Sequence, residues 1–270
     1  MSDQRRARIE DSHKEPHQEP DHPDDGPTDG QDDVRLLRSR GCWAAAAALL
    51  EPQAAHSPGI ALTRAELLIE QARFTGRHWA AAEAALRLAE AGAHSDAERS
   101  AAACARGYLA YAATLLGVHD RLDEAQAALG RASALLPPGA PGRPLLDFRR
   151  GLVAEDLLRD PASARTAYRR AHAGAEQQQD DLLLSDTWQH LASIARQDGN
   201  LAGARHGFAE SLRLRELTGF AIGLAPALAS LADVSTAAEA TLLRAQASRL
   251  LRAFGGVPVE AAGEQWPGRA

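Results

Sequence analysis

Residues 188–212, WQHLASIARQDGNLAGARHGFAESL, predict two short helices joined by a tight turn. One face of the first helix carries residues spaced three and four apart, as helical packing requires: Trp188, Leu191 and Ala192. Gly199-Asn200 supplies the turn, because both residues tolerate the left-handed conformation that ends many helices. The second helix repeats the spacing with Ala204 and Phe208. Small residues on both helices let the backbones approach closely, so this stretch indicates a packed helical hairpin.

The composition of the whole chain favours helices over strands. The 270 residues are 45% hydrophobic but only 4% aromatic, so a core has to be built mainly from Ala and Leu. Alanine has the highest helix propensity, while the β-branched residues typical of strands are sparse. We therefore expect an all-α fold.

The hairpin pattern recurs along the chain. The small residue of the second helix returns at intervals of 35, 44, 39 and 40 residues: Ala46, Ala81, Ala125, Ala164 and Ala204. Intervals near 40 imply about five to six hairpins with long helices, stacked into a right-handed α-solenoid. The fourth hairpin is less regular, because Gly151 lies one position before the place where a small residue is preferred. We expect the first helix at about 33–40.

The two ends of the chain differ in composition from the part between them. Residues 1–33 carry eleven acidic and four basic residues and hardly any large apolar side chain, so we expect a disordered acidic tail. Prolines in this tail prevent an ordered helix that would align its histidines for a metal. We expect the helical repeat domain over 34–254 and a loose C-terminal tail over 255–270.

The spacing and residue types of these hairpins resemble the tetratricopeptide repeat (TPR), a helix–turn–helix unit. The phrase FAESLRLRELTGFAIGLAPALASLADV, residues 208–234, is similar to the long-repeat TPR arrays in the C-terminal halves of bacterial LuxR-like, SARP-type and NB-ARC regulators. The resemblance covers roughly residues 34–254. It implies a bacterial scaffold or regulatory module that docks a protein or senses an effector, while DNA binding and nucleotide hydrolysis belong to other domains in that family.

The charge distribution and the targeting signals limit which partners and which cell compartment we expect. Outside the acidic tail the net charge is close to zero, which gives no electrostatic reason to expect nucleic-acid binding. No apolar run approaches the ~20 residues of a membrane span, and the N-terminus carries charges where a signal peptide is apolar. Cys42 and Cys104 are expected to be reduced thiols. We therefore expect a cytoplasmic protein that contacts neither membrane nor nucleic acid.

Motifs of catalysis are missing from the sequence. There is no phosphate-binding loop, no zinc-binding His-Glu-x-x-His and no nucleophile elbow, and the histidines have no Cys or carboxylate at a spacing that completes a site. We nominate no catalytic residue, no metal site and no cofactor, and expect that the chain is not an enzyme.

The concave face of a stacked-hairpin protein is lined by the first helix of each pair. The register of Trp188 predicts solvent-facing inner positions that would bind a ligand or protein: Arg73, Arg149, Asp156, Gln189, Ser193 and Arg196. The arginines are the best candidates to hold carboxylates, because a guanidinium binds them through two hydrogen bonds. By the same offset Glu66 and Glu70 join this face, and the third hairpin contributes only small residues such as Ala110.

Two hypotheses follow from these observations. The first is a non-enzymatic, regulatory module that binds a polypeptide partner in an open concave groove. The alternative is a sensor domain that closes around a short peptide or a small-molecule effector, which would raise its melting temperature.

Overall fold

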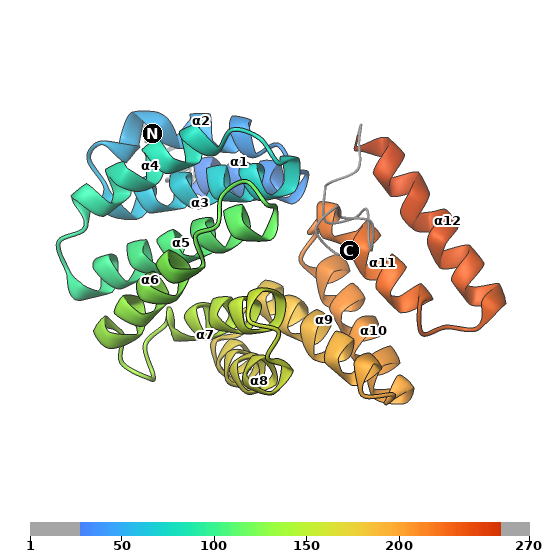
Figure 1. Ribbon diagram of the computed structural model, residues 1–270. Helices are drawn as coiled ribbons and strands as arrows, with labels where there is room; N and C mark the ends of the chain where they lie inside the picture. Colours follow the sequence, from blue (N-terminus) through green and yellow to red (C-terminus); the bar gives the residue numbers. More distant parts are fainter. Residues whose placement is uncertain (1–27, 255–270) are drawn as a thin grey trace, which may run out of the picture.

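The computed structural model describes residues 28–254, and within them the chain forms twelve α-helices and no strand (Figure 1). The helices are α1 (Thr28–Ser39), α2 (Trp43–Ala54), α3 (Pro58–Thr75), α4 (Trp79–Gly92), α5 (Asp96–Leu115), α6 (Leu122–Leu135), α7 (Arg143–Leu152), α8 (Pro161–Gln178), α9 (Asp181–Gln197), α10 (Leu201–Leu217), α11 (Leu224–Ala232) and α12 (Ala237–Ala253). A π-helical turn, η1 (Val153–Leu157), continues α7, and a 3₁₀ turn, η2 (Ala221–Gly223), precedes α11. Consecutive helices pack in pairs, so the described chain is a row of six hairpins. The prediction of an all-α hairpin repeat is confirmed.

The hairpin of α9 and α10 has the packing that its sequence predicts. Ala192 and Ala204 are buried together with Phe208 in one apolar cluster. A Cβ added to Gly207 would lie 2.8 Å from the Cβ of Ala192, so the two helices touch at this glycine. Gly199 takes the left-handed conformation with φ 79°. Asn200 instead caps α10, because its Oδ1 accepts a hydrogen bond from the backbone N–H of Gly203 at 3.0 Å.

Two helices begin earlier than the sequence pattern suggests. α3 begins at Pro58, because the Ser57 side chain accepts from the N–H of Ile60 and proline suits the first helical turn. α1 begins at Thr28, six residues before the domain boundary expected at Val34. Its first turns expose Asp32 and Asp33, whose negative charges favour a helix N-terminus without any apolar contact. The remainder of the expected tail, residues 1–27, and the expected tail 255–270 lie outside the described residues.

The π-helical turn explains the irregular fourth hairpin. A π turn takes up one extra residue compared with an α-helix. The extra residue lies between Gly151 and the turn at Arg159, and it restores Gly151 to the position that packs on the second helix. A Cβ on Gly151 would approach the Tyr168 ring to 2.4 Å, so only glycine fits here. The one-residue offset in the sequence is therefore real.

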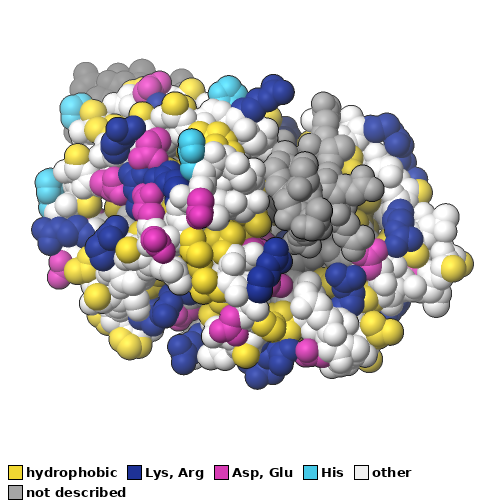
Figure 2. All heavy atoms as spheres, in the orientation of Figure 1, with side chains coloured by type: hydrophobic (Ala, Val, Ile, Leu, Met, Phe, Trp, Pro, Cys, Tyr) yellow, Lys and Arg dark blue, Asp and Glu magenta, His cyan; other side chains and the backbone are white. Residues whose placement is uncertain are grey.

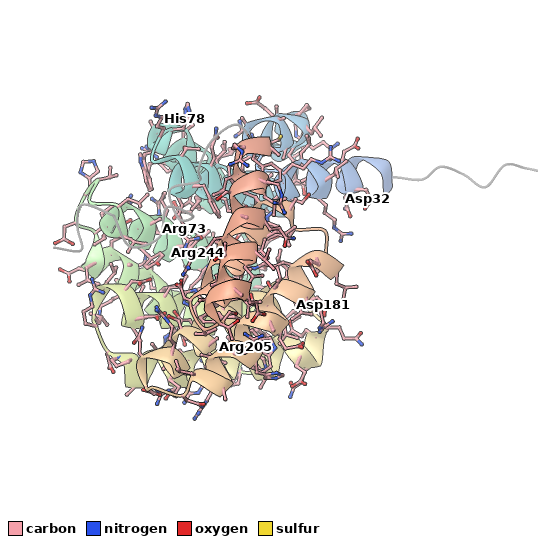
Figure 3. The ribbon with its side chains drawn as sticks, turned by 90° about the vertical axis from the view of Figure 1, so that its right-hand side faces the viewer. Asp32, Arg73, His78, Asp181, Arg205 and Arg244 are labelled. Atoms are coloured by element: carbon pink, nitrogen blue, oxygen red, sulfur yellow. The ribbon has the colours of Figure 1, made fainter. Side chains whose placement is uncertain are left out.

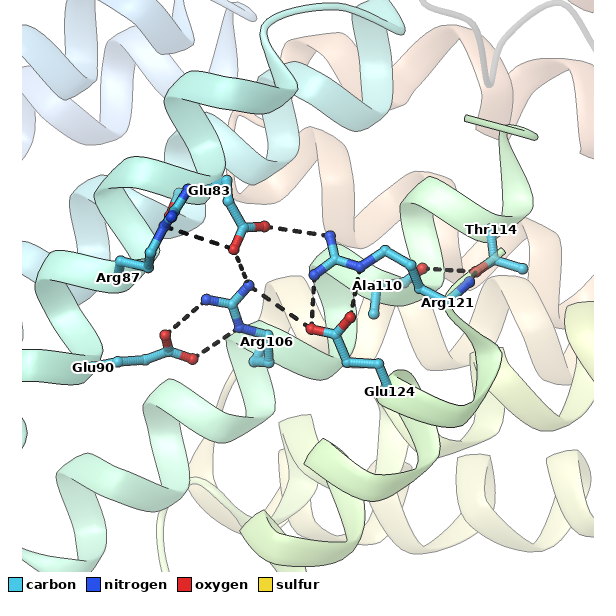
Figure 4. A network of polar contacts seen from close by, with 8 residues as sticks. All are labelled: Glu83, Arg87, Glu90, Arg106, Ala110, Thr114, Arg121 and Glu124. Carbon is cyan, nitrogen blue, oxygen red and sulfur yellow. Dashed lines mark hydrogen bonds and ion pairs between the residues drawn. The ribbon is translucent and has the colours of Figure 1, made fainter. Parts of the chain in front are cut away.

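Adjacent hairpins are also joined by polar contacts. Arg106, buried on α5, donates hydrogen bonds to Glu83 and Glu90 of α4, while Arg121 donates to Glu124 at 2.6 Å and to Glu83 at 3.3 Å (Figure 4). Figure 2 shows acidic and basic side chains gathered over this part of the molecule. Burial alone would raise the pKa of Glu83, but the hydrogen bond and charge of Arg106 outweigh it and lower the pKa.

The last helix packs on α11 and buries few residues completely. α12 buries only Ala240 and Ala247, and it is tied to the preceding elements by the ion pairs Arg205–Glu239 at 2.8 Å and Arg244–Asp233 at 2.9 Å. Figure 3 shows α12 running across the front of the molecule, with Arg244 on it and Arg205 near its lower end. These exposed pairs add little stability, so the attachment of α12 depends mainly on its apolar contact with α11, in which Ala247 packs near Ala225 and Leu228.

The row of hairpins curves until the first hairpin meets η2, just before the sixth hairpin. The turn between α1 and α2 lies against η2, and a Cβ on Gly41 would come within 2.5 Å of Cδ1 of Ile222. Ile222 belongs to the apolar cluster that also contains Val34 and Trp43. In Figure 1 the first hairpins accordingly lie across from α11 and α12, with α5 to α10 around the remaining circumference. The concave face is therefore an inner wall that the stack encloses. In the described part of the chain no helix is long and apolar enough to span a membrane.

Candidate functional site

The inner wall carries a group of polar side chains from three successive hairpins, which we call the inner polar cluster. Its members are Glu66, Arg73, Cys104, Tyr108, Tyr111, Arg149 and Asp156. Glu66 and Arg73 come from α3, where positions seven apart share a face. Cys104, Tyr108 and Tyr111 come from the corresponding face of α5. Arg149 and Asp156 come from α7 and η1. Three of the predicted residues, Arg73, Arg149 and Asp156, are thus brought together.

Arg149 is the centre of the cluster. Its Nη2 donates to Oε1 of Glu66 at 2.8 Å, its Nη1 donates to Sγ of Cys104 at 3.4 Å, and its guanidinium lies 4.7 Å from the centre of the Tyr108 ring. The residue is 7% exposed, so the prediction that it faces solvent is wrong. The physical reason is the curvature of the stack, which brings α3 and α7 together although Glu66 and Arg149 are 83 residues apart.

Tyr108 lies between two guanidinium groups. Arg73 donates a hydrogen bond from Nη1 to the Tyr108 hydroxyl at 2.9 Å, and its Cζ lies 5.5 Å from the ring centre. Cζ of Arg149 lies 4.7 Å from the same ring centre. A cation over an aromatic ring is worth about 0.5–2 kcal/mol, more where water is excluded. The tyrosine therefore fixes both arginines in place and leaves their positive charge inside the inner wall.

Two acidic residues of η1 point to different layers of the structure. Asp156 accepts a hydrogen bond from the Tyr111 hydroxyl at 2.6 Å, inside the inner polar cluster. Glu155 accepts from the Tyr168 hydroxyl at 2.7 Å and lies 2.8 Å from Nδ1 of His190, between the fourth and fifth hairpins. Burial raises the pKa of Tyr111 and of Tyr168, and the neighbouring carboxylates raise both further. Both tyrosines therefore stay protonated and act as donors.

The other predicted residues form a second group on α9. Gln189 donates from Nε2 to the Ser230 hydroxyl of α11 at 2.6 Å, while Ser193 and Arg196 are half-buried further along the same helix. The Oε1 of Gln189 and the Nε of Arg196 are buried without a hydrogen-bond partner among the described residues. Such atoms cost free energy unless a water or a ligand satisfies them. The α9 part of the inner wall therefore has hydrogen-bonding capacity that a ligand could use.

Further polar contacts join neighbouring helices, and the sequence pattern does not predict them. Glu70 accepts from Nε of Arg38 at 3.0 Å and from the Trp43 indole N–H at 3.1 Å, which joins the first and second hairpins. Asp186 accepts from Nη2 of Arg215 at 3.0 Å within the α9–α10 hairpin. These partners are 27 to 32 residues apart in the sequence.

The sequence spacing does not predict the two tyrosines of the third hairpin. It assigns small residues such as Ala110 to the inner face, but Ala110 is fully buried, and it is Tyr108 and Tyr111 that bond to Arg73 and Asp156. These partners lie on other hairpins, so the spacing within α5 alone does not indicate the contacts. The signal that could have found Tyr108 and Tyr111 is their spacing of three, one helical turn, on a helix otherwise rich in Ala.

The chemistry of the site is that of binding groups. Burial raises the pKa of the Cys104 thiol more than Arg149 lowers it, so the thiol stays protonated and is a poor nucleophile. Among residues 28–254 there is no group of three or more His, Cys, Asp or Glu side chains placed to hold a metal ion. What the inner wall offers is two fixed guanidiniums, two phenols and the amide and guanidinium of α9. These groups recognise carboxylates and peptide carbonyls.

Comparison with known proteins adds one structural similarity. No protein-family model and no curated protein sequence matches the chain. Among solved structures, the chain is similar to the crystal structure of BtubC (BKLC) from P. vanneervenii, with a TM-score of 0.54 and 14% sequence identity. The match covers 82% of this chain and 92% of that chain. At this identity the similarity concerns the fold alone, and it supports the all-helical arrangement described above.

Proposed function

We propose that the chain is a non-enzymatic interaction module of the TPR type, with a regulatory role, that binds a polypeptide through its inner wall. The observation that carries the proposal is the environment of the Arg149 guanidinium. It is held between the Tyr108 ring and Glu66, whose side chain is 32% exposed. A carboxylate from a partner can approach the same guanidinium from the side that Glu66 occupies, because Glu66 still reaches solvent. Glu66 is then an internal substitute for a ligand carboxylate.

The α9 part of the wall extends this site. Gln189 and Arg196 carry buried polar atoms without partners among the described residues, and Ser193 lies between them. An extended peptide offers one carbonyl and one N–H per residue, which matches a line of polar side chains along a helix. We infer that a peptide places an acidic side chain or its terminal carboxylate at Arg149 and its backbone along α9.

The free cysteines support a reducing compartment. Cys42 and Cys104 are both free thiols in the structure, as is usual for proteins of the cytoplasm. We propose that the module acts there, in a bacterial cell.

A photocrosslinking experiment tests the proposal. The amino acid p-benzoylphenylalanine replaces Ser193 on the inner wall or, as a control, the exposed Arg169 on the outer face of α8. Irradiation in the native cell lysate should attach a discrete polypeptide at position 193 and not at position 169. Adding Arg196→Glu should remove the adduct while the circular dichroism spectrum is unchanged. Equal labelling at both positions, or an adduct insensitive to Arg196→Glu, contradicts binding at the inner wall.

A second candidate function is favoured by the closure of the stack. Because the α1–α2 turn packs on Ile222, a ligand inside the wall would be enclosed, as in a sensor of short peptides or small effectors. An effector bound only by the folded state raises the melting temperature by mass action. Thermal-shift screening of dicarboxylates and acidic dipeptides distinguishes the two functions. A sensor shows a saturable rise and no crosslinked polypeptide, whereas a protein-binding module shows the reverse.

A further inference from the structure

A second concave surface lies on the side of α7 opposite the inner wall. It is a cavity of about 570 Å³ between the third and fourth hairpins, at the lower left of Figure 1, where α6 and α8 lie on either side of α7 and η1. A cavity of this size falls within the usual range of ligand-binding clefts. We call it the outer groove.

The floor of the outer groove carries apolar side chains, and polar ones lie beside them. Leu129 of α6 and Val153 and Ala154 of η1 form its buried base, while Leu158 is 44% exposed and Ala167 continues the floor toward α8. The lining also has polar side chains: Gln126, Ser163 and Thr166. The π-helical turn therefore forms part of the floor, and π-turns inside α-helices are frequently found at functional sites. Apolar side chains flanked by polar ones suit an amphipathic helix, whose apolar contact residues recur at i, i+3, i+4 and i+7.

The rim of the outer groove is basic. Arg150 and Arg170 line it, and both are exposed with no ion pair assigned to either side chain. The carboxylate in the lining, Asp147, is buried and already accepts from Nε of Arg143 at 3.1 Å. The groove therefore presents two available positive charges beside the apolar side chains of its floor. A partner that fits both features has acidic side chains beside a hydrophobic stripe.

Adjacent arginines of α7 thus serve the two surfaces. Arg149 points to the inner wall and is paired with Glu66, whereas Arg150 lines the outer groove and stays exposed. The two surfaces lie on different faces of α7, because consecutive residues of a helix point about 100° apart. Changes to one can therefore be made without touching the other.

We propose that the outer groove is a docking site for an acidic amphipathic helix of a partner protein. The apolar side chains of that helix, such as leucines, lie on the floor formed by Leu129, Val153 and Leu158. The carboxylates that flank them on the helix pair with Arg150 and Arg170. This site is independent of the polypeptide site proposed on the inner wall.

Gly130 provides a way to block the groove without harming the fold. It lines the outer groove on α6, and a Cβ added there meets no atom within 4 Å. Gly130→Phe therefore places a ring in open space inside the groove. Gly130→Ala adds a single methyl group and leaves the groove open, so it is the matched control.

The test is the binding of a fluorescein-labelled peptide of about 15 residues, with leucines at i, i+3, i+4 and i+7 and glutamates on both flanks. Fluorescence anisotropy should give saturable binding to the full chain with a Kd below roughly 100 μM. A peptide with arginines in place of the glutamates, and one with the same residues in scrambled order, should bind at least about tenfold more weakly.

Variants of the protein complete the test. Arg150→Glu/Arg170→Glu and, separately, Gly130→Phe should each raise the Kd at least about tenfold. Arg131→Glu/Arg169→Glu, which changes the charge equally at exposed arginines of α6 and α8 outside the groove, should leave it within about twofold. Arg196→Glu on the inner wall should also leave it unchanged. The proposal is overturned if the acidic peptide does not bind, if the scrambled or basic peptide binds equally well, or if Gly130→Phe binds like Gly130→Ala.

Discussion

The same substitution, Gly→Ala, should have opposite effects at two helical positions of this protein. Alanine in place of glycine inside a helix stabilises by about 0.5–1 kcal/mol through propensity alone. Gly130 of α6 has no atom within 4 Å of an added Cβ, so Gly130→Ala should keep that full gain. For a chain of this size 1 kcal/mol corresponds to about 2–4 °C, so its melting temperature should rise by about 1–4 °C.

Gly207 of α10 has no such space. An added Cβ would lie 2.8 Å from the Cβ of Ala192, 3.2 Å from Cε3 of Trp188 and 3.4 Å from the Trp188 carbonyl oxygen. Carbon atoms normally rest about 3.5–4.0 Å apart, so α9 and α10 have to separate by several tenths of an ångström. Overpacking of this kind costs about 1–3 kcal/mol, which exceeds the propensity gain. The net loss of about 0.5–2 kcal/mol should lower the melting temperature by about 1–8 °C.

Circular dichroism at 222 nm during heating measures both variants, with urea denaturation as an independent measure of the free energy of unfolding. The contrast in sign is the test, because helix propensity alone predicts stabilisation at both positions. A rise in melting temperature for Gly207→Ala equal to that for Gly130→Ala would refute the close approach of α9 and α10, and with it the hairpin register on which the inner wall rests.

Three other perturbations test separate parts of the structure. Ala204→Trp forces an indole into the buried contact of α9 and α10 and should cost at least about 3 kcal/mol, seen as a large drop in melting temperature; an unchanged melting curve would contradict the hairpin. Arg149→Met and Glu66→Gln should each lower the free energy of unfolding, and the loss in the double variant should be about 1 kcal/mol smaller than the sum of the two single losses. The coupling is modest because Glu66 reaches solvent, and strict additivity would contradict their ion pair. Burial lowers the pKa of His172, so as the pH falls through about 6.5 the imidazole is protonated in the unfolded chain before it is protonated in the folded protein, and the free energy of unfolding should fall. His172→Gln should flatten that fall in a series of urea titrations at different pH values, and an identical pH profile for both proteins would contradict it.

Local features of the chain were read correctly from sequence wherever the signal was itself local. The glycine turn at Gly199 and the small residues Ala192 and Ala204 are determined by backbone sterics and helical periodicity, which operate over a few residues. The contacts of Tyr108 and Tyr111 on the third hairpin are not predictable in this way. Their partners, Arg73 and Asp156, lie on other hairpins, so no short window of sequence contains both sides of either contact.

The sequence by itself determined that this protein is a row of Ala-rich helical hairpins, because propensity, turn chemistry and the spacing of small residues all act locally. Only the tertiary structure decided that the row closes, that Arg149 meets Glu66 across 83 residues, and that Arg150 beside it faces an open groove. The physical reason is that small rotations add up along the row. Each hairpin is rotated slightly against the one before it, and the sum of these rotations sets the surfaces that a partner meets. No single repeat encodes that sum.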